Sequence, residues 1–190
     1  MNRRATGAPI GAVLALGVCL LAGCGDRGGE GGAGGQGFDE VDVSGSAGEA
    51  PLVSLYFPND RGTLSAESRR LPTWSTPEEG ARILIEALLA GPESDALGAP
   101  LPEGTALGTV HLSDMALLYV DLVSTVHPSP PVSGSRMELT TVYSLVDSVL
   151  LNLADVEAVV LLWNGRQLPT FAGHVDTSLP LRADADLVAR

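Results

Sequence analysis

Three histidines are the residues of this 190-residue sequence best suited to acid–base or metal chemistry. His111 lies close to Asp114 and His174 close to Asp176, while His127 precedes a proline. Two imidazoles and a carboxylate could hold a metal ion, and Ser, His and Asp side chains together could form a hydrolytic site. Their spacing matches no His-Glu-x-x-His motif, no Gly-x-Ser-x-Gly turn and no phosphate loop. We therefore predict no catalytic residues, no metal and no cofactor, with solvent-facing or locally hydrogen-bonded histidines.

Two charged pairs permit a second kind of chemistry. Glu78 and Glu79 resemble a pair of catalytic carboxylates, but adjacent helical residues point about 100° apart. Both belong to a first helical turn, where the helix dipole favours anions, so we interpret them as structural. Arg69 and Arg70 fall in an expected loop. They could contact a phosphate or carboxylate at the surface, or form part of a solvated turn.

Trp74 is the aromatic side chain that we expect to be exposed, because it lies in a proline-containing loop. An exposed indole is a candidate for surface contact, including stacking on a glycan. The chain has few aromatic residues, and most of the others are expected in the core: Tyr56, Phe57, Trp163 and Phe171.

The region before Cys24 has the organisation of an export signal. Arg3 and Arg4 precede an apolar run, 10–22, that is too short to span a bilayer. The run ends in Leu-Ala-Gly23-Cys24, which resembles the bacterial lipobox. The resemblance implies removal of residues 1–23, diacylglyceryl transfer to the Cys24 thiol and acylation of the new amino terminus, typically with palmitate. Several acyl chains anchor stably where one is marginal, at about 0.8 kcal/mol per buried CH₂. An ordinary secretory signal with a coincidental cysteine is the alternative.

Composition limits the remaining possibilities. Removal of the signal leaves 9 arginines against 23 acidic residues, a net charge of −14, which argues against binding to nucleic acid or anionic headgroups. No second segment has the length and apolarity of a membrane span. The two cysteines are Cys19, which is lost with the signal, and Cys24, so no disulfide is expected. The folded part must therefore depend on its own core.

Glycine dominates the chain directly after Cys24. Residues 24–50 contain few apolar side chains and cannot bury enough surface to offset the entropy of ordering, which predicts a disordered, flexible tether. Residues 51–190 are long enough for one domain of ordinary size.

Alternating element signals in 51–190 predict an α/β (α+β) domain. The sequence predicts a strand over 52–57. A helix follows, with Thr76 as N-cap, Pro77 in the first position and Glu79 closing a capping box, and it ends at Gly91-Pro92. Strands at 106–112 and 115–122, joined by a tight turn at 113–114, form a hairpin. Asp121 is expected to accept backbone N–H groups at a turn.

The second half of the domain repeats this alternation. A second capping box, Ser135 to Glu138, opens a helix that continues to Leu153. The apolar run 158–163 predicts a buried strand, and Asn164-Gly165 is a strong turn signal before a return strand at 166–168. We expect a single mixed sheet with both amphipathic helices on one face.

Several segments, in order, resemble the sporulation-and-germination (GerMN) domain family. The resemblance runs from Leu52 to Leu181, over almost the whole folded part. It implies a small α/β domain common in bacterial envelope lipoproteins, with no assigned catalytic residues. The segments that carry it are 55–59, 87–92, 101–105, 119–122, 159–165 and 176–181.

The function expected from these observations is that of a non-catalytic, lipid-anchored envelope protein. It would lie outside the cytoplasm on the cell membrane or outer membrane, and would bind an envelope protein or a second copy of itself through a sheet edge or helix face. The alternative is a lipoprotein that binds glycan or peptidoglycan fragments. An enzyme of unknown reaction is a third possibility.

Overall fold

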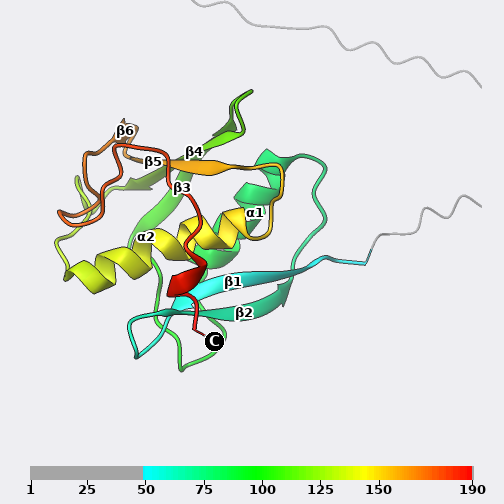
Figure 1. Cartoon of the computed structure of the whole chain (residues 1–190), viewed down its shortest axis with the longest axis horizontal. Helices are drawn as coiled ribbons and strands as arrows, with labels where there is room; N and C mark the ends of the chain where they lie inside the picture. Colours follow the sequence, from blue (N-terminus) through cyan, green and yellow to red (C-terminus); the bar gives the residue numbers. More distant parts are fainter. Residues whose placement is uncertain (1–48, 190) are drawn as a thin grey trace, which may run out of the picture. The chain divides into compact units, whose positions relative to one another are not determined.

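The computed structural model describes residues 49–189, and these form an α+β domain with three layers. Figure 1 shows two helices, α1 (Pro77–Leu89) and α2 (Ser135–Leu150), between a two-stranded and a four-stranded sheet. The two helices pack on each other, and each contacts both sheets, α1 mainly β3 and α2 mainly β1. The predicted fold class is confirmed. In place of the expected single sheet there are two, because β1 pairs with β2 in a separate sheet that covers the other side of the helices.

The two-stranded sheet is an antiparallel hairpin of β1 (Leu52–Pro58) and β2 (Leu64–Arg70). The opening strand was predicted, but the loop expected to contain Arg69 and Arg70 is strand β2. Asn59 holds the connecting turn, since its Oδ1 accepts the N–H groups of Arg61 (3.0 Å) and Thr63 (3.1 Å). The sequence did not predict β2, because most of its inward-facing side chains are polar and the apolar alternation typical of a strand is missing.

The four-stranded sheet has the order β3-β4-β5-β6 and is mixed, as predicted. β4 pairs in parallel with β5, and the other pairs are antiparallel. The strands are β3 (Thr105–Leu112), β4 (Leu117–Ser124), β5 (Ala158–Trp163) and β6 (Arg166–Gln167). The predicted two-residue turn between β3 and β4 is wrong. A four-residue connection makes this turn, in which Ala116 has a φ of 56° and its N–H donates to Ser113 O.

The predicted turn between β5 and β6 and the predicted role of Asp121 on β4 are both confirmed. Asn164 and Gly165 have φ of 50° and 75°, as a tight hairpin turn between right-twisted strands requires. Asp121 Oδ1 accepts the Gly165 N–H at 2.8 Å, the turn-capping role expected of it.

α1 begins and ends where the sequence predicted. Thr76 Oγ1 accepts the Glu79 N–H at 3.2 Å, and Pro77 is the first helical residue. The Glu79 carboxylate accepts the Ser75 N–H (2.8 Å), one residue before the N-cap, so the reciprocal bond of the capping box is displaced. Gly91, with a φ of 88°, follows the helix.

α2 differs from its prediction at the first turn. Its N-cap is Gly134, which supplies no side-chain bond, so the predicted capping box of Ser135 and Glu138 is wrong. Glu138 is fully buried and turns away to another loop. Ser148 of α2 and Asn152, just beyond its end, lie against β1: Ser148 Oγ accepts the Tyr56 N–H (2.9 Å) and Asn152 Oδ1 accepts the Ser54 N–H (3.1 Å). These side chains replace a neighbouring strand along the free edge of β1.

The C-terminal residues 181–189 form a segment that we term the C-terminal strap. Leu181 exchanges both backbone hydrogen bonds with Val159 of β5, at 2.7 and 2.8 Å. The short 3₁₀ helix η1 (Ala185–Leu187) follows, and the Ala189 N–H donates to Leu64 O of β2 at 2.7 Å. The strap thus connects the two sheets across α2.

Candidate functional site

The histidines and aspartates considered for catalysis lie apart in the structure. His111 of β3 is exposed and pairs with Glu78 Oε1 at 3.2 Å. His127 acts through its backbone, since its carbonyl accepts the Trp163 indole N–H at 3.0 Å. Within residues 49–189, no group of three His, Cys, Asp or Glu side chains could hold a metal ion.

His174 takes part in the most complete polar cluster of the domain. Its Nδ1 lies 2.7 Å from Glu138 Oε2, and the Glu138 carboxylate accepts the backbone N–H groups of Ala172, His174 and Val175 at 2.8–3.1 Å. Burial alone raises the pKa of Glu138, but these N–H donors and the His174 ring outweigh it, and the pKa lies below its ordinary value of 4.5. The cluster fixes the loop 171–175 onto α2.

The sequence did not lead us to expect that Glu138 is buried and binds the loop 171–175. The sequence did carry a signal, because Glu138 is in helical phase with the buried residues Val142, Leu145 and Val149. A carboxylate in phase with an apolar stripe must find buried donors, and loop N–H groups supply them.

Arg69 is a clamp inside the domain and not a surface contact. Its guanidinium pairs with Glu67 and donates to the carbonyls of Ala87 (3.2 Å) and Gly91 (2.7 Å). The group also lies over the Phe57 ring, 5.3 Å from its centroid. With 10% of its side chain exposed, Arg69 is unavailable to a ligand, and the predicted solvated turn is wrong. Arg70, by contrast, is 56% exposed and remains open to contact.

Trp74 is half-buried, which corrects its expected exposure. Its indole packs over Gly80 of α1, where an added Cβ would come within 2.9 Å of the ring. One face of the indole is therefore occupied by the helix. The other aromatic predictions hold for Phe57, Trp163 and Phe171, all buried, with the last two rings in edge-to-face contact at 5.7 Å.

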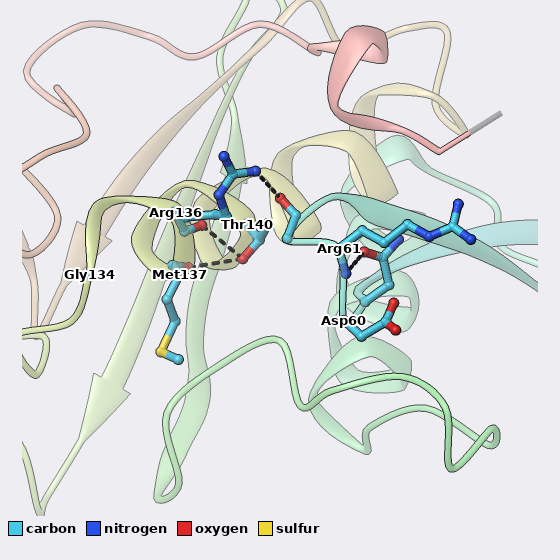
Figure 2. A pocket seen from close by; sticks show the side chains of 8 residues that line it. Asp60, Arg61, Gly134, Arg136, Met137 and Thr140 are labelled. Carbon is cyan, nitrogen blue, oxygen red and sulfur yellow. Dashed lines mark hydrogen bonds between the residues drawn. The ribbon is translucent and has the colours of Figure 1, made fainter.

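A hollow of about 410 Å³ lies between the β1–β2 turn and the first turn of α2. Figure 2 shows Arg136 reaching from α2 to the carbonyl of Gly62 (3.4 Å), while the Arg61 side chain extends away from it. Met137 and Thr140 complete the α2 wall. The Arg136 stem covers Gly62 closely, since a Cβ there would lie 2.1 Å from Cδ. This hollow offers hydrogen-bond donors but brings together no nucleophile and base.

The outer edge of β3 is the surface best formed for contact with another chain. The Leu112 N–H donates to Glu78 at 2.6 Å, so it faces away from β4, and alternation along the strand places the Val110 N–H on the same edge. A bulge at Gly108 interrupts the register with β4. Beside this edge, the rings of His111 and Tyr119 stack with centroids 6.4 Å apart. We term this edge, with exposed Ala106, Thr109, His111 and Tyr119, the β3 surface.

The other long edges of the described sheets differ from the β3 surface. The edge of β1 is satisfied by Ser148 of α2 and by Asn152 just after it, and that of β5 by β6 and Leu181. β2 carries charged and small polar side chains on its outer side, which disfavour strand addition. β3 instead presents an uncharged, partly apolar strand apart from His111.

The sequence matches the family model Germane, described as sporulation and spore germination, over residues 54–169. The match covers more than half of the chain. The chain belongs to the Germane family. This description names processes rather than a reaction, and no curated protein matches the chain.

Solved structures of other proteins, GerMN domains among them, show the same fold. The first GerMN domain of the sporulation protein GerM from Bacillus subtilis matches with a TM-score of 0.54 and 18% identity, covering 70% of this chain and 97% of that one. A Clostridium perfringens protein with a provisional lipoprotein description gives 0.50 and 20%, covering 71% and 89%. The tandem GerMN domains of GerM give 0.52 and 19%, covering 70% and 46%. The match covers less than half of the tandem chain, as expected when one domain of this chain aligns with one of the tandem domains.

The predicted signal peptide, lipidation site and most of the tether lie outside the described residues. These are residues 1–23, Gly23-Cys24 at the cleavage site, and 24–48. Among residues 49–189, no helix has the length and apolarity needed to cross a membrane.

Proposed function

We propose that this Germane-family protein is a lipid-anchored, non-catalytic protein of the cell envelope that binds a partner protein through the β3 surface. The partner adds a strand along β3 and packs against the His111–Tyr119 ring pair. The anchor is the acylated Cys24, and residues 24–50 join it to the domain. The lipobox-like sequence and the lipoprotein description of the Clostridium perfringens neighbour support the anchor.

The observation that carries the proposal is the outer edge of β3 before Leu112, whose own N–H is already accepted by Glu78. Unpaired backbone groups on a sheet edge can form main-chain hydrogen bonds with a second chain, and neighbouring side chains then select the partner. Ala106, Thr109 and His111 lie exposed along this strand, and Tyr119 supplies an amphipathic ring of the kind enriched at protein interfaces.

Site-specific photo-crosslinking in cells tests the proposal. A photoreactive amino acid is placed at Ala106 on β3 or, as a control, at Ala66 on β2; both positions are exposed. We expect a discrete crosslinked species from position 106 and none from position 66. Mass spectrometry then identifies the crosslinked protein as a second copy or as another envelope protein.

A charge placed on the edge provides the matched variants. Ala106→Lys should reduce complex formation at least several-fold, because a lysine on an edge strand opposes strand addition. Ala66→Lys adds the same charge to the other sheet and should leave the complex unchanged. Equal crosslinking from both positions, or an undiminished complex in Ala106→Lys, would refute the β3 surface as the binding site.

A further inference from the structure

We propose that the C-terminal strap is a pH-sensitive latch, closed while the buried Asp147 carboxyl is protonated and loosened when it ionises. This inference concerns the opposite side of the domain from α1 and β3, and it does not depend on partner binding by the β3 surface. It rests on three attachments of the strap and on the unusual surroundings of the middle one.

The strap is attached at its two ends by backbone bonds to strands. Leu181 pairs with Val159 of β5, and Ala189 donates to Leu64 of β2. Its midpoint is attached differently, by a single bond from the Asp184 N–H to Asp147 Oδ1 of α2, at 2.9 Å. The midpoint therefore depends on the state of one carboxyl group.

Asp147 is fully buried, and its second oxygen has no partner. Oδ2 forms no hydrogen bond among the described residues, and neither does the buried Ser144 Oγ one turn earlier on the same helix. An ionised carboxylate in this position is a buried charge with a single N–H donor, and burying it costs more than burying the neutral acid. The geometry therefore favours the neutral acid.

The neighbouring Asp184 carboxylate also favours the neutral form of Asp147. Burial raises the pKa of Asp147 to about 6; the Asp184 N–H opposes this, and the Asp184 carboxylate adds to it by repulsion. From β1 and from α2 itself the facing groups are Tyr56 and Tyr143, whose pKa values are raised above 10, so they remain neutral across the relevant range.

The direction of the pH effect follows from linkage. In the closed strap Asp147 holds its proton up to about pH 6, while an exposed aspartate loses it near 3.8. Opening thus becomes more favourable as pH rises from about 4 to 6 and is independent of this group at higher pH. Opening would free the backbone groups of Leu64 on β2 and Val159 on β5 that the strap occupies.

Amide hydrogen exchange of the full chain, followed by mass spectrometry at pH 5 and pH 7.5, tests the latch. Exchange times are corrected for the intrinsic pH dependence, so that the opening equilibrium of the strap peptide is compared directly. If Asp147 becomes solvated on opening, the two pKa values predict about a tenfold increase in opening from pH 5 to 7.5. Peptides from β3 and β4 provide the internal reference.

Two variants separate this effect from a general change in charge. Asp147→Asn cannot ionise and should show the same corrected opening at both pH values. Asp186→Asn removes an exposed charge from the same strap and should retain the tenfold change. The latch is refuted if the parent shows no change, or if Asp147→Asn retains it.

A measurement on the unaltered protein covers the case in which Asp147→Asn does not fold. Carbon-13 NMR of the aspartate carboxyl groups should find one resonance titrating near pH 6, assigned to Asp147 through its contact with the Asp184 amide. Titration of that resonance near pH 4 would overturn the proposal.

Discussion

Two buried carboxylates on α2, those of Glu138 and Asp147, have pKa values shifted in opposite directions. Glu138 accepts three backbone N–H groups and a histidine ring bond, and its pKa is lowered. Asp147, nine residues later, accepts a single N–H beside another carboxylate, and its pKa is raised to about 6. Both side chains are fully buried; at Asp147 burial dominates the pKa, whereas at Glu138 the hydrogen-bond donors outweigh it.

Glu138→Gln should destabilise the domain by about 2 kcal/mol, since the amide NH₂ replaces an acceptor that faces backbone N–H groups. The lowered pKa means that ionised Glu138 stabilises the fold above pH 4.5 and that this stabilisation is lost as pH falls through the folded-state pKa. Urea unfolding of parent and variant between pH 3 and 6 checks both expectations.

His174→Ala is the control for this prediction. It removes the ring bond and retains the backbone donors, so its cost should be smaller, about 1 kcal/mol. A Glu138→Gln variant as stable as the parent would show that the loop 171–175 is held by other contacts.

At the scale of elements, β2 is held in place by an ion pair where an apolar stripe is usual. Glu67 and Arg69 occupy alternate inward positions, and the Glu67 carboxylate also accepts the N–H groups of Glu93 and Ser94 at 3.1–3.2 Å. Burial raises the pKa of Glu67, but these bonds and Arg69 outweigh it and lower the pKa overall. β2 and the end of α1 are thus joined by a nearly complete set of polar partners.

Arg69→Ala should destabilise the domain by about 2–3 kcal/mol, because it removes charge-assisted bonds and leaves the Glu67 carboxylate, 14% exposed, without its cation. Arg70→Ala is the matched control on the next residue. Its partner Glu49 is 81% exposed, so the cost should be at most about 1 kcal/mol. Thermal and urea unfolding of both variants provide the measurement, and equal losses would contradict the clamp.

For the whole molecule, the proposed anchor and the fold are independent of each other. Cys24 lies outside the described residues, and the domain forms its core from residues between Val53 and Leu181. Attachment to a membrane and stability of the domain should therefore respond to different substitutions.

Cys24→Ser should release the protein from the membrane fraction while the melting temperature of the domain stays unchanged. Several acyl chains, each contributing about 0.8 kcal/mol per buried CH₂, are lost with the thiol. Fractionation of cells and mass spectrometry of the parent check the prediction. A parent that retains its first methionine or a free thiol at Cys24 would contradict it.

Local signals in the sequence were sufficient for most of the fold. Thr76 and Pro77 mark the start of α1, Asn164 and Gly165 form the predicted turn, and the apolar run 158–163 is the buried strand β5. These features depend on a few neighbouring residues, whose backbone preferences act over a single turn or strand.

The candidate site was less accessible from the sequence. Arg69 and Trp74 are less exposed than the sequence predicted, because their positions depend on α1, which packs against both. The β3 surface also could not be recognised, since an edge is defined by which neighbouring strand is absent, and that follows from the order of the assembled sheet.

The sequence by itself determined the helices, the buried strands and the Asn164–Gly165 turn, because hydrophobic periodicity and backbone preference are local properties. Only the tertiary structure decided which polar groups meet: Glu138 with loop 171–175, Arg69 with the end of α1, and Asp147 with the C-terminal strap. The physical reason is that burial and hydrogen bonding between residues up to 37 positions apart set the charge of these groups, and no short segment encodes that proximity.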